Sequence, residues 1–402
     1  MVREYKDSGI TWIGSIPKEW KTERIKALFS ERNERDCQGK TLLSVSQYFG
    51  IRPKSETDLA DSHIAESYDD YKEVRKGDFV MNIMLAWNGS YSVSDYDGIV
   101  SPAYCVFKFR KDCCKKYFHY LLRTDGYPSA FKTMSRGVID SRLRLYPEQF
   151  YTFPVIIPSV DEQQRIADYL DKKCAEIDGL IELQEQMIAQ LTDYKQSVIT
   201  EAVTKGINPD AQLVPSGIDS IGDVPEEWKV CQLKRFLLFQ NGQDYKEIEV
   251  KEGDGFPVYG SGGIFTYAER YMYDGESVLF GRKGTVNRPL YVNCKFWTVD
   301  TMYYTIPKKD VNCKFMYYVA TTLPFDKYST STALPSMTQT ILGNLKVAIP
   351  AKDEQSVIVE YLDKKCGEID NLIAVKQQKI ETLKEYKKSI IFECVTGKKE
   401  IN

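Results

Sequence analysis

The chain has 402 residues, of which 43% are hydrophobic and 28% are charged, and its formal net charge is −3. This length is sufficient for two to four domains that each bury a core, and no apolar run approaches the length that spans a bilayer. The ten cysteines form no CxxC pair and only two histidines occur. We therefore expect reduced thiols in a cytoplasmic protein, with no His/Cys metal site and no catalyst built on histidine.

Two segments of the chain occur twice. The segment SGITWIGSIPKEWK, residues 8–21, returns as SGIDSIGDVPEEWK at residues 216–229, a shift of 208 positions. A longer segment that begins DEQQRIADYLDKKC at residue 161 returns as DEQSVIVEYLDKKC at residue 353, a shift of 192 positions. The chain therefore consists of two tandem units, and the inserts between the repeats, residues 21–157 and 229–349, show no such similarity to each other.

The first insert alternates short apolar strands, turns and short amphipathic helices, which predicts an α+β module. Its strand GDFVMN, residues 77–82, leads into a turn whose polar and aromatic side chains have the chemistry to enter a groove and bond base edges: Asn82, Trp87 and Asn88. The alternative for Trp87 is a place in the core. Downstream, three arginines surround a predicted turn, where we expect phosphate contacts: Arg136, Arg142 and Arg144.

A long helix follows the first insert. The sequence Pro158-Ser159-x-x-Glu162 is typical of an N-terminal capping box, and Gly179 is the only glycine or proline between residues 161 and 203. Apolar residues recur in alternating steps of four and three, which is the period of a coiled coil. Since the second copy has the same spacing, we expect the two helices to pair in antiparallel orientation. The expected seam comprises Ile166, Leu170, Ile177, Leu180 and Leu191 in the first helix and Ile358, Leu362, Ile369, Leu372 and Leu383 in the second.

The second insert has two turns suited to phosphate. One is glycine-rich, residues 259–263, and the other, Gly-Arg-Lys-Gly-Thr at residues 281–285, is basic. The candidate DNA contacts are Ser261, Arg282, Lys283 and Thr285, and residues 329–338 add hydroxyl groups. Neither turn matches a Walker A loop or a dinucleotide fingerprint. The alternative is a pair of ordinary hairpin turns.

The charge is unevenly distributed. Residues 21–150 carry 21 basic and 18 acidic side chains, and residues 229–350 carry 15 and 11, so the inserts have net charges of +3 and +4. The helical segment 161–206 carries 5 basic and 10 acidic side chains, and residues 207–228 carry five acidic side chains and no basic one. This pattern favours a nucleic-acid partner for the inserts; the alternative is an unevenly charged solvated surface.

Catalytic motifs are missing from the sequence. It contains no amino-methyltransferase (D/N)PP(Y/F) motif, no S-adenosylmethionine loop, no P-loop and no PD…(D/E)xK nuclease site. We therefore expect a chain that is not an enzyme.

Together, these features resemble the specificity subunit of type I restriction-modification enzymes. The resemblance rests on the paired repeats at Ser8 and Ser216, on the two DEQ helix starts, and on the insert motifs GDFVMN and PVYGSGG. It implies an α+β fold with two globular target recognition domains joined by two long antiparallel coiled-coil helices in a pseudo-twofold repeat. The implied domains are residues 1–157, the first recognition domain with the repeat segment 8–21; 158–206, the first helical region; 207–349, the linker repeat and second recognition domain; and 350–402, the second helical region.

The resemblance also implies the partners. Each recognition domain would bind one half of a bipartite, asymmetric site in double-stranded DNA, and the helices would set the spacer between the halves. Two modification subunits would methylate adenine with S-adenosylmethionine. Restriction subunits would hydrolyse ATP with Mg²⁺, so this chain itself would hold no cofactor and contact no membrane.

Two other functions fit the residues less well. The first is a scaffold whose variable modules bind proteins, and the second is a stand-alone DNA methyltransferase or nuclease. Salt-dependent binding to DNA distinguishes recognition from the scaffold. Methylation of DNA without a partner would identify the stand-alone enzyme.

Overall fold

A computed structural model of the chain describes residues 3–35, 39–47, 50–57, 68–139, 142–328 and 335–401. It divides the chain into two compact units, Met1–Leu183 with Lys379–Asn402, and Gln184–Gln378. The first is called unit 1 and the second unit 2. Two long helices, α4 (Val160–Lys205) and α8 (Lys352–Val395), contribute one half to each unit.

The module of unit 1 is built on a four-stranded antiparallel sheet in the order β4-β11-β8-β9. These strands are β4 (Phe29–Arg32), β11 (Tyr104–Phe109), β8 (Phe79–Asn82) and β9 (Tyr91–Val93). All of β8 is buried, because Phe79 and Met81 face the main core while Val80 faces a smaller one. Aromatic rings fill the main core, and the rings of Phe79 and Phe150 stack 5.6 Å apart.

Helices and short strand pairs complete unit 1. The helices are α1 (Lys115–Leu122), α2 (Gly126–Met134) and α3 (Pro147–Phe150). The pairs are β1 (Tyr5–Asp7) with β2 (Ser15–Pro17), β3 (Lys21–Arg24) with β12 (Pro154–Ile157), β5 (Leu43–Ser46) with β6 (Gly50–Pro53), and β7 (Lys72–Val74) with β10 (Gly98–Val100). Both chain ends belong to this unit, since Tyr5 Oη donates to the Gly397 carbonyl at 3.0 Å and Lys398 Nζ donates to the Ile13 carbonyl at 2.5 Å.

Unit 2 contains a seven-stranded sheet in the order β16-β22-β20-β21-β18-β19-β17. Its strands are β16 (Leu237–Asn241), β22 (Met302–Pro307), β20 (Tyr273–Gly281), β21 (Leu290–Thr298), β18 (Phe256–Gly260), β19 (Gly263–Ala268) and β17 (Glu249–Val250). The helices are α5 (Cys313–Ala320), α6 (Phe325–Tyr328) and α7 (Gln339–Asn344). Two strand pairs lie outside the sheet, β13 (Leu213–Pro215) with β14 (Asp223–Pro225), and β15 (Lys229–Gln232) with β23 (Lys346–Ile349).

The two inserts share a framework that sequence comparison missed. The order β4-β11-β8-β9 in unit 1 corresponds to β16-β22-β20-β21 in unit 2, and α1 corresponds to α5. Gly77, just before β8, corresponds to Gly275 within β20, and Lys116 and Lys314 lie on the matching helices, both pairs 198 positions apart. The framework preserves the pattern of burial rather than residue identity, so the two inserts share a core architecture although their sequences differ.

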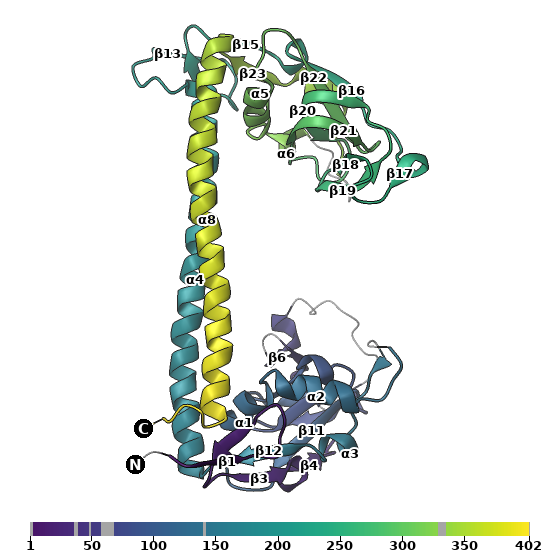
Figure 1. Cartoon of the computed structure of the whole chain (residues 1–402), viewed down its shortest axis with the longest axis vertical. Coiled ribbons are helices and arrows are strands. Elements are labelled where there is room, and N and C mark those ends of the chain that lie inside the picture. Colours follow the sequence, from purple (N-terminus) through teal and green to yellow (C-terminus); the bar gives the residue numbers. More distant parts are fainter. Residues whose placement is uncertain are drawn as a thin grey trace. The chain divides into compact units, whose positions relative to one another are not determined.

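The helices α4 and α8 run side by side in opposite directions within each unit (Figure 1). In unit 1, Lys387 Nζ lies 2.7 Å from a carboxylate oxygen of Asp178, and in unit 2 Lys195 makes the same contact with Asp370. These two ion pairs are related by the 192-residue shift. The predicted antiparallel pairing, and with it the α+β fold, is therefore confirmed.

The residues of the predicted seam differ in burial. Ile166, Leu170, Ile177, Ile358, Leu362 and Ile369 are buried, and Leu191 and Leu383 are half-buried. Leu180 and Leu372, however, are 45% and 52% exposed, so placing them in the seam is wrong. The half-buried Ile181 and the buried Gln184 take the inward positions beside Leu180. An alternation of four- and three-residue steps predicts the inward face of a helix only to within one residue. From Ile177 the step of four comes first and leads to Ile181, whereas the prediction took the step of three to Leu180.

Candidate nucleic-acid interface

The turn after β8 is held by its own side chains. Asn82 is only 5% exposed, and its Oδ1 accepts the Met84 amide at 3.0 Å. Asn88 Oδ1 accepts the amide and the hydroxyl of Ser90. Both amide oxygens therefore stabilise the turn, and Asn82 does not lie on the surface as the sequence suggested. Trp87 is half-buried, donates from Nε1 to the Met84 carbonyl at 3.1 Å, and has Lys132 Nζ 5.0 Å from its ring centre.

The three predicted arginines of unit 1 lie on one hairpin. Arg136 and Arg144 exchange backbone hydrogen bonds, both at 2.9 Å, and Arg142 lies between them in the chain. The side chains of Arg136 and Arg142 are exposed, whereas Arg144 is half-buried. The Leu145 amide donates to the Ile83 carbonyl at 2.9 Å, which joins this hairpin to the turn after β8.

An apolar tip accompanies these arginines. Val138 is 98% exposed and Ile139 is 54% exposed, beside the exposed Met134 at the end of α2. Apolar side chains displayed among arginines suit contact with thymine methyl groups or with unstacked bases. Sequence reasoning missed this tip and Lys132, because neither forms a recognisable motif.

The basic turn of unit 2 follows β20 at the position equivalent to the turn after β8. Gly281 is required there, since a Cβ would overlap the Thr285 carbonyl. Arg282 is half-buried, donates from Nη1 to the Asp300 carbonyl at 3.3 Å, and lies over the Tyr303 ring. Lys283 and Thr285 are exposed. Lys283 and Thr285 therefore remain candidates for DNA contact, while Arg282 also supports the turn.

The neighbouring segment of unit 2 completes this surface. The Met337 amide donates to the Arg282 carbonyl at 3.0 Å, as Leu145 does to Ile83 in unit 1, and the Gly284 amide donates to the Pro335 carbonyl at 2.9 Å. Of the hydroxyl-rich stretch, residues 329–334 lie outside the described residues. Thr338 is occupied as the cap of α7, since its Oγ1 accepts the Ile341 amide at 3.2 Å.

The glycine-rich turn lies near the basic turn. The Tyr259 carbonyl accepts the Thr298 hydroxyl at 2.9 Å, and Arg282 bonds to Asp300 and Thr301 two residues further along the same segment. Ser261, half-buried in the turn between β18 and β19, therefore belongs to the same end of the sheet. The predicted residues of each unit thus gather on one edge of its own module.

Each module is also fixed to its helix by the same set of contacts. In unit 1, Lys116 and Tyr120 on α1 bond to the Asp171 carboxylate at 2.5 and 2.8 Å. In unit 2, Lys314 and Tyr318 bond to Asp363, both at 2.7 Å. Burial, with the carboxylate as a further cause, raises the pKa of both tyrosines, so the hydroxyls remain donors. These contacts set the orientation of each module against the helix of the same unit.

The described residues contain no group of three or more His, Cys, Asp or Glu side chains that would hold a metal ion. Burial raises the pKa of the Cys105 and Cys313 thiols to about 12, so both thiols are protonated at neutral pH. Burial also lowers the pKa of His119 to about 4, which leaves its ring neutral at pH 7. In the part of the chain that the structure covers, no helix is long and apolar enough to cross a membrane.

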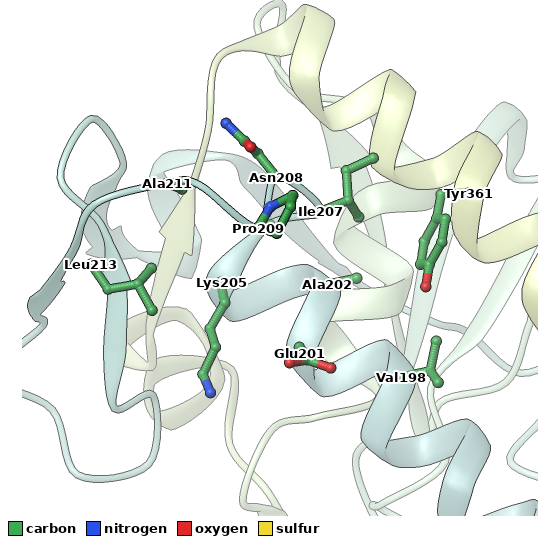
Figure 2. A pocket seen from close by; sticks show the side chains of 11 residues that line it. Val198, Glu201, Ala202, Lys205, Ile207, Asn208, Pro209, Ala211, Leu213 and Tyr361 are labelled. Atoms are coloured by element: carbon green, nitrogen blue, oxygen red, sulfur yellow. The ribbon is translucent and has the colours of Figure 1, made fainter.

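A cavity of 470 Å³ lies in unit 2 beside the end of α4, between Val198, Lys205 and Tyr361 (Figure 2). The corresponding site of unit 1 is occupied differently, because Lys399 Nζ lies 5.6 Å from the ring centre of Tyr169, the counterpart of Tyr361. The cavity lies far in sequence from the turns that follow β8 and β20. The two units therefore differ in packing beside this tyrosine, which borders a cavity in unit 2 and a lysine in unit 1.

Comparison with known proteins identifies the architecture. The family model described as type I restriction modification DNA specificity domain matches residues 17–193 and 225–385. Two proteins of Methanocaldococcus jannaschii are similar over nearly their whole length: the putative type I restriction enzyme MjaX specificity subunit, 23% identical over 99% of this chain and 98% of its own, and the MjaVIII specificity subunit, 22% identical over 95% and 93%.

Solved structures agree with the fold. One is a chain from work on complex assembly and conformational transition of a type I R-M system, with a TM-score of 0.72 and 16% identity, covering 95% of this chain and 99% of that one. Another is the HsdS subunit from Thermoanaerobacter tengcongensis, with a TM-score of 0.52 and 16% identity over 95% of this chain and 98% of that one.

Proposed function

The chain belongs to the type I restriction-modification specificity family, and we propose that its two modules recognise the two halves of its DNA target through the edges described above. Unit 1 would use Trp87, Arg136, Arg142 and the tip at Val138. Unit 2 would use Ser261, Lys283 and Thr285. The observation that carries the proposal is that equivalent turns, after β8 and β20, present different side chains on one framework.

The chemistry of these edges supports a division of roles. Exposed arginine and lysine side chains bind phosphates without regard to sequence, and an arginine held in a fixed orientation binds guanine O6 and N7 with two hydrogen bonds. Because the two edges differ in composition, the two half-sites should differ, and the target should not be a palindrome. The net charges of +3 and +4 are modest, so we expect much of the affinity to come from the partner subunits.

The partners are proposed from the surface of the paired helices. Three exposed apolar side chains of one helix recur in the other at the 192-residue shift: Leu180 with Leu372, Leu183 with Val375, and Tyr194 with Tyr386. In unit 1 these exposed side chains are Leu180, Leu183 and Tyr386, and in unit 2 they are Leu372, Val375 and Tyr194; we call each set the apolar patch of its unit. Such a duplicated surface suits two copies of one protein, which we infer to be the modification subunit.

The remaining assignments follow from this role. Methylation with S-adenosylmethionine, and ATP- and Mg²⁺-dependent cleavage, would be carried out by modification and restriction subunits, and the present chain would contribute recognition alone. The compartment would be the cytoplasm, where the DNA and these partners meet. The four-part division of the chain at residues 157, 206 and 349 remains a prediction.

Exchange of residues 21–157 for the corresponding insert of another specificity subunit tests modular recognition. We expect one half of the methylated sequence to change and the other half to remain, because each edge is confined to its own module. Genome-wide sequencing of methylated adenines in cells that carry the hybrid measures both halves at once. A hybrid that changed both halves, or neither, would contradict separate recognition.

Replacement of Leu180 and Tyr386 by glutamate tests the patches. We expect the number of bound modification subunits to fall from two to one, since charges in the unit 1 patch would prevent burial while the unit 2 patch is intact. Mass photometry of the chain with purified modification subunit counts the copies. The matched control is Gln190→Glu, which adds a charge at an exposed position of the same helix. Retention of two copies by the double variant would exclude the patch.

A further inference from the structure

The repeated segments 8–14 and 216–222 differ at one large side chain, since Trp12 of unit 1 corresponds to Ser220 of unit 2. In unit 1 the Trp12 ring packs edge-on against Tyr127 with 5.6 Å between ring centres. It also lies directly on Gly126, where a Cβ would overlap the ring. The isoleucines beside it, Ile10 and Ile13, are both only 2% exposed. Trp12 therefore packs its segment against the start of α2.

The same place in unit 2 can be located through the helix ends. Thr124 and Thr322 each donate a hydroxyl hydrogen bond of 2.8 Å to the carbonyl three residues earlier, which aligns the end of α1 with the end of α5. Two residues further on, Gly126 and Tyr127 correspond to Pro324 and Phe325. Ser220 thus occupies the position of a tryptophan that would pack against Pro324.

The missing side chain leaves a cavity. A cavity of 420 Å³ lies at this position, and its lining includes Ile218, Ser220, Leu323, Pro324, Tyr328 and Ile341. The counterparts of the two deeply buried isoleucines, Ile218 and Ile221, are only half-buried. The volume is within the range of small-ligand sites, and a mainly apolar lining with a few polar groups suits an aromatic ring. We call this cavity the Ser220 slot.

One lysine, Lys346, lines the Ser220 slot, whereas the segment that carries Ser220 is acidic. Residues 207–228, which include Ser220, have no lysine or arginine, and their acidic side chains are all exposed: Asp210, Asp219, Asp223, Glu226 and Glu227. An acidic surface repels DNA and attracts basic protein segments. A peptide that places an aromatic ring in the slot should therefore bind more tightly if lysine or arginine flanks the ring.

We propose that the Ser220 slot is a docking site for a partner polypeptide that inserts an aromatic side chain flanked by lysine or arginine. The inserted ring takes the place that Trp12 fills within unit 1. Since unit 1 already contains its own tryptophan, the site exists in one unit only. It therefore binds one copy of its partner, in contrast to the duplicated patches on the helices, and it is independent of DNA recognition.

Binding of short peptides to the full chain tests the slot. The probe is the blocked tripeptide Lys-Trp-Lys, compared with Lys-Ala-Lys and Glu-Trp-Glu, followed by ligand-observed NMR at low salt. We expect one site with a dissociation constant on the order of millimolar, as for other small ligands. We also expect at least tenfold weaker binding of the other two peptides. Equal binding of Lys-Ala-Lys would overturn the aromatic part of the proposal, and equal binding of Glu-Trp-Glu would overturn the electrostatic part.

Variants locate the binding site. Ser220→Trp restores the residue of unit 1 and should reduce binding of Lys-Trp-Lys at least tenfold, whereas Ser220→Ala, which leaves the slot open, should retain it within about twofold. Ile341→Trp narrows the slot from α7 and provides a second test if Ser220→Trp does not fold. DNA binding by the folded variants should equal that of the unmodified protein. Undiminished peptide binding by a folded filled-slot variant would show that the slot is not the site.

Discussion

Replacing Lys283 and Arg288 together by glutamate is expected to weaken binding to the target duplex by about 100-fold or more at moderate salt. Both side chains are exposed in the turn between β20 and β21. Reversing their charge converts attraction to the phosphates into repulsion, and the loss of each phosphate contact should reduce the dependence of log K on log salt by about one. Titration of the duplex at several salt concentrations measures both quantities. Arg282 is left unchanged because it supports the turn.

The matched control is Lys309→Glu. Lys309 is an exposed lysine of the same module, beyond the opposite end of β22 from the basic turn. It changes the charge of unit 2 without touching the recognition edge, so we expect less than a threefold effect. Assembly with the modification subunit should be retained by all variants. If Lys309→Glu weakened binding as much per charge as the double variant, general electrostatics rather than the edge would account for the loss.

Replacing Asp78 by alanine is expected to destabilise unit 1 by about 3 kcal/mol, because it leaves a buried guanidinium without its main partner. Arg32 binds Asp78 through Nε at 2.7 Å and Nη2 at 3.2 Å, and the two side chains are only 9% and 6% exposed. Asp78 Oδ2 also accepts the Arg75 amide at 2.9 Å. Glu34 keeps one contact with Arg32, which places the expected loss at the lower end of the range for buried pairs. Hydrogen exchange of the β8 amides in increasing urea measures the effect.

An exposed ion pair provides the comparison. Lys18 and Glu4 lie 2.7 Å apart with side chains 66% and 73% exposed, so Lys18→Ala should cost about 0–1 kcal/mol. Unit 2 should unfold as in the unmodified protein in both variants. Equal losses for Asp78→Ala and Lys18→Ala would mean that burial of the Arg32–Asp78 pair does not determine its contribution.

The helices could be predicted well because their signals are local. The predicted start at Ser159 is confirmed, since Ser159 Oγ accepts the Glu162 amide at 3.3 Å and α4 begins at Val160. The inward face could be predicted only to within one residue, because Leu180 and Ile181 satisfy the same periodicity. The position of α8 decides between them, and that position depends on contacts distant in sequence.

The recognition edges were harder to predict for a related reason. Motifs located the turns after β8 and β20, but they did not show that Asn82 is buried, and they did not locate the exposed Val138. Strand β8 is buried on both faces, so its side chains do not alternate between apolar and polar. Without that alternation the sequence does not show at which residue the buried strand ends and the exposed turn begins. The strand order shared by the inserts could not be predicted, because it is kept by burial and strand pairing, which amino-acid identity does not reveal.

The distribution of the chain between the units has a consequence for synthesis. Unit 2 is contained in one continuous segment, whereas unit 1 needs both its own first 183 residues and Lys379–Asn402. Ile390, Cys394 and Val395 belong to the core of unit 1 together with Ile166 and Leu170. During translation the earlier module must therefore hold an uncovered apolar helix face until Lys379–Asn402 has left the ribosome, while the later module can already be complete. The part of the protein made first is the part finished last.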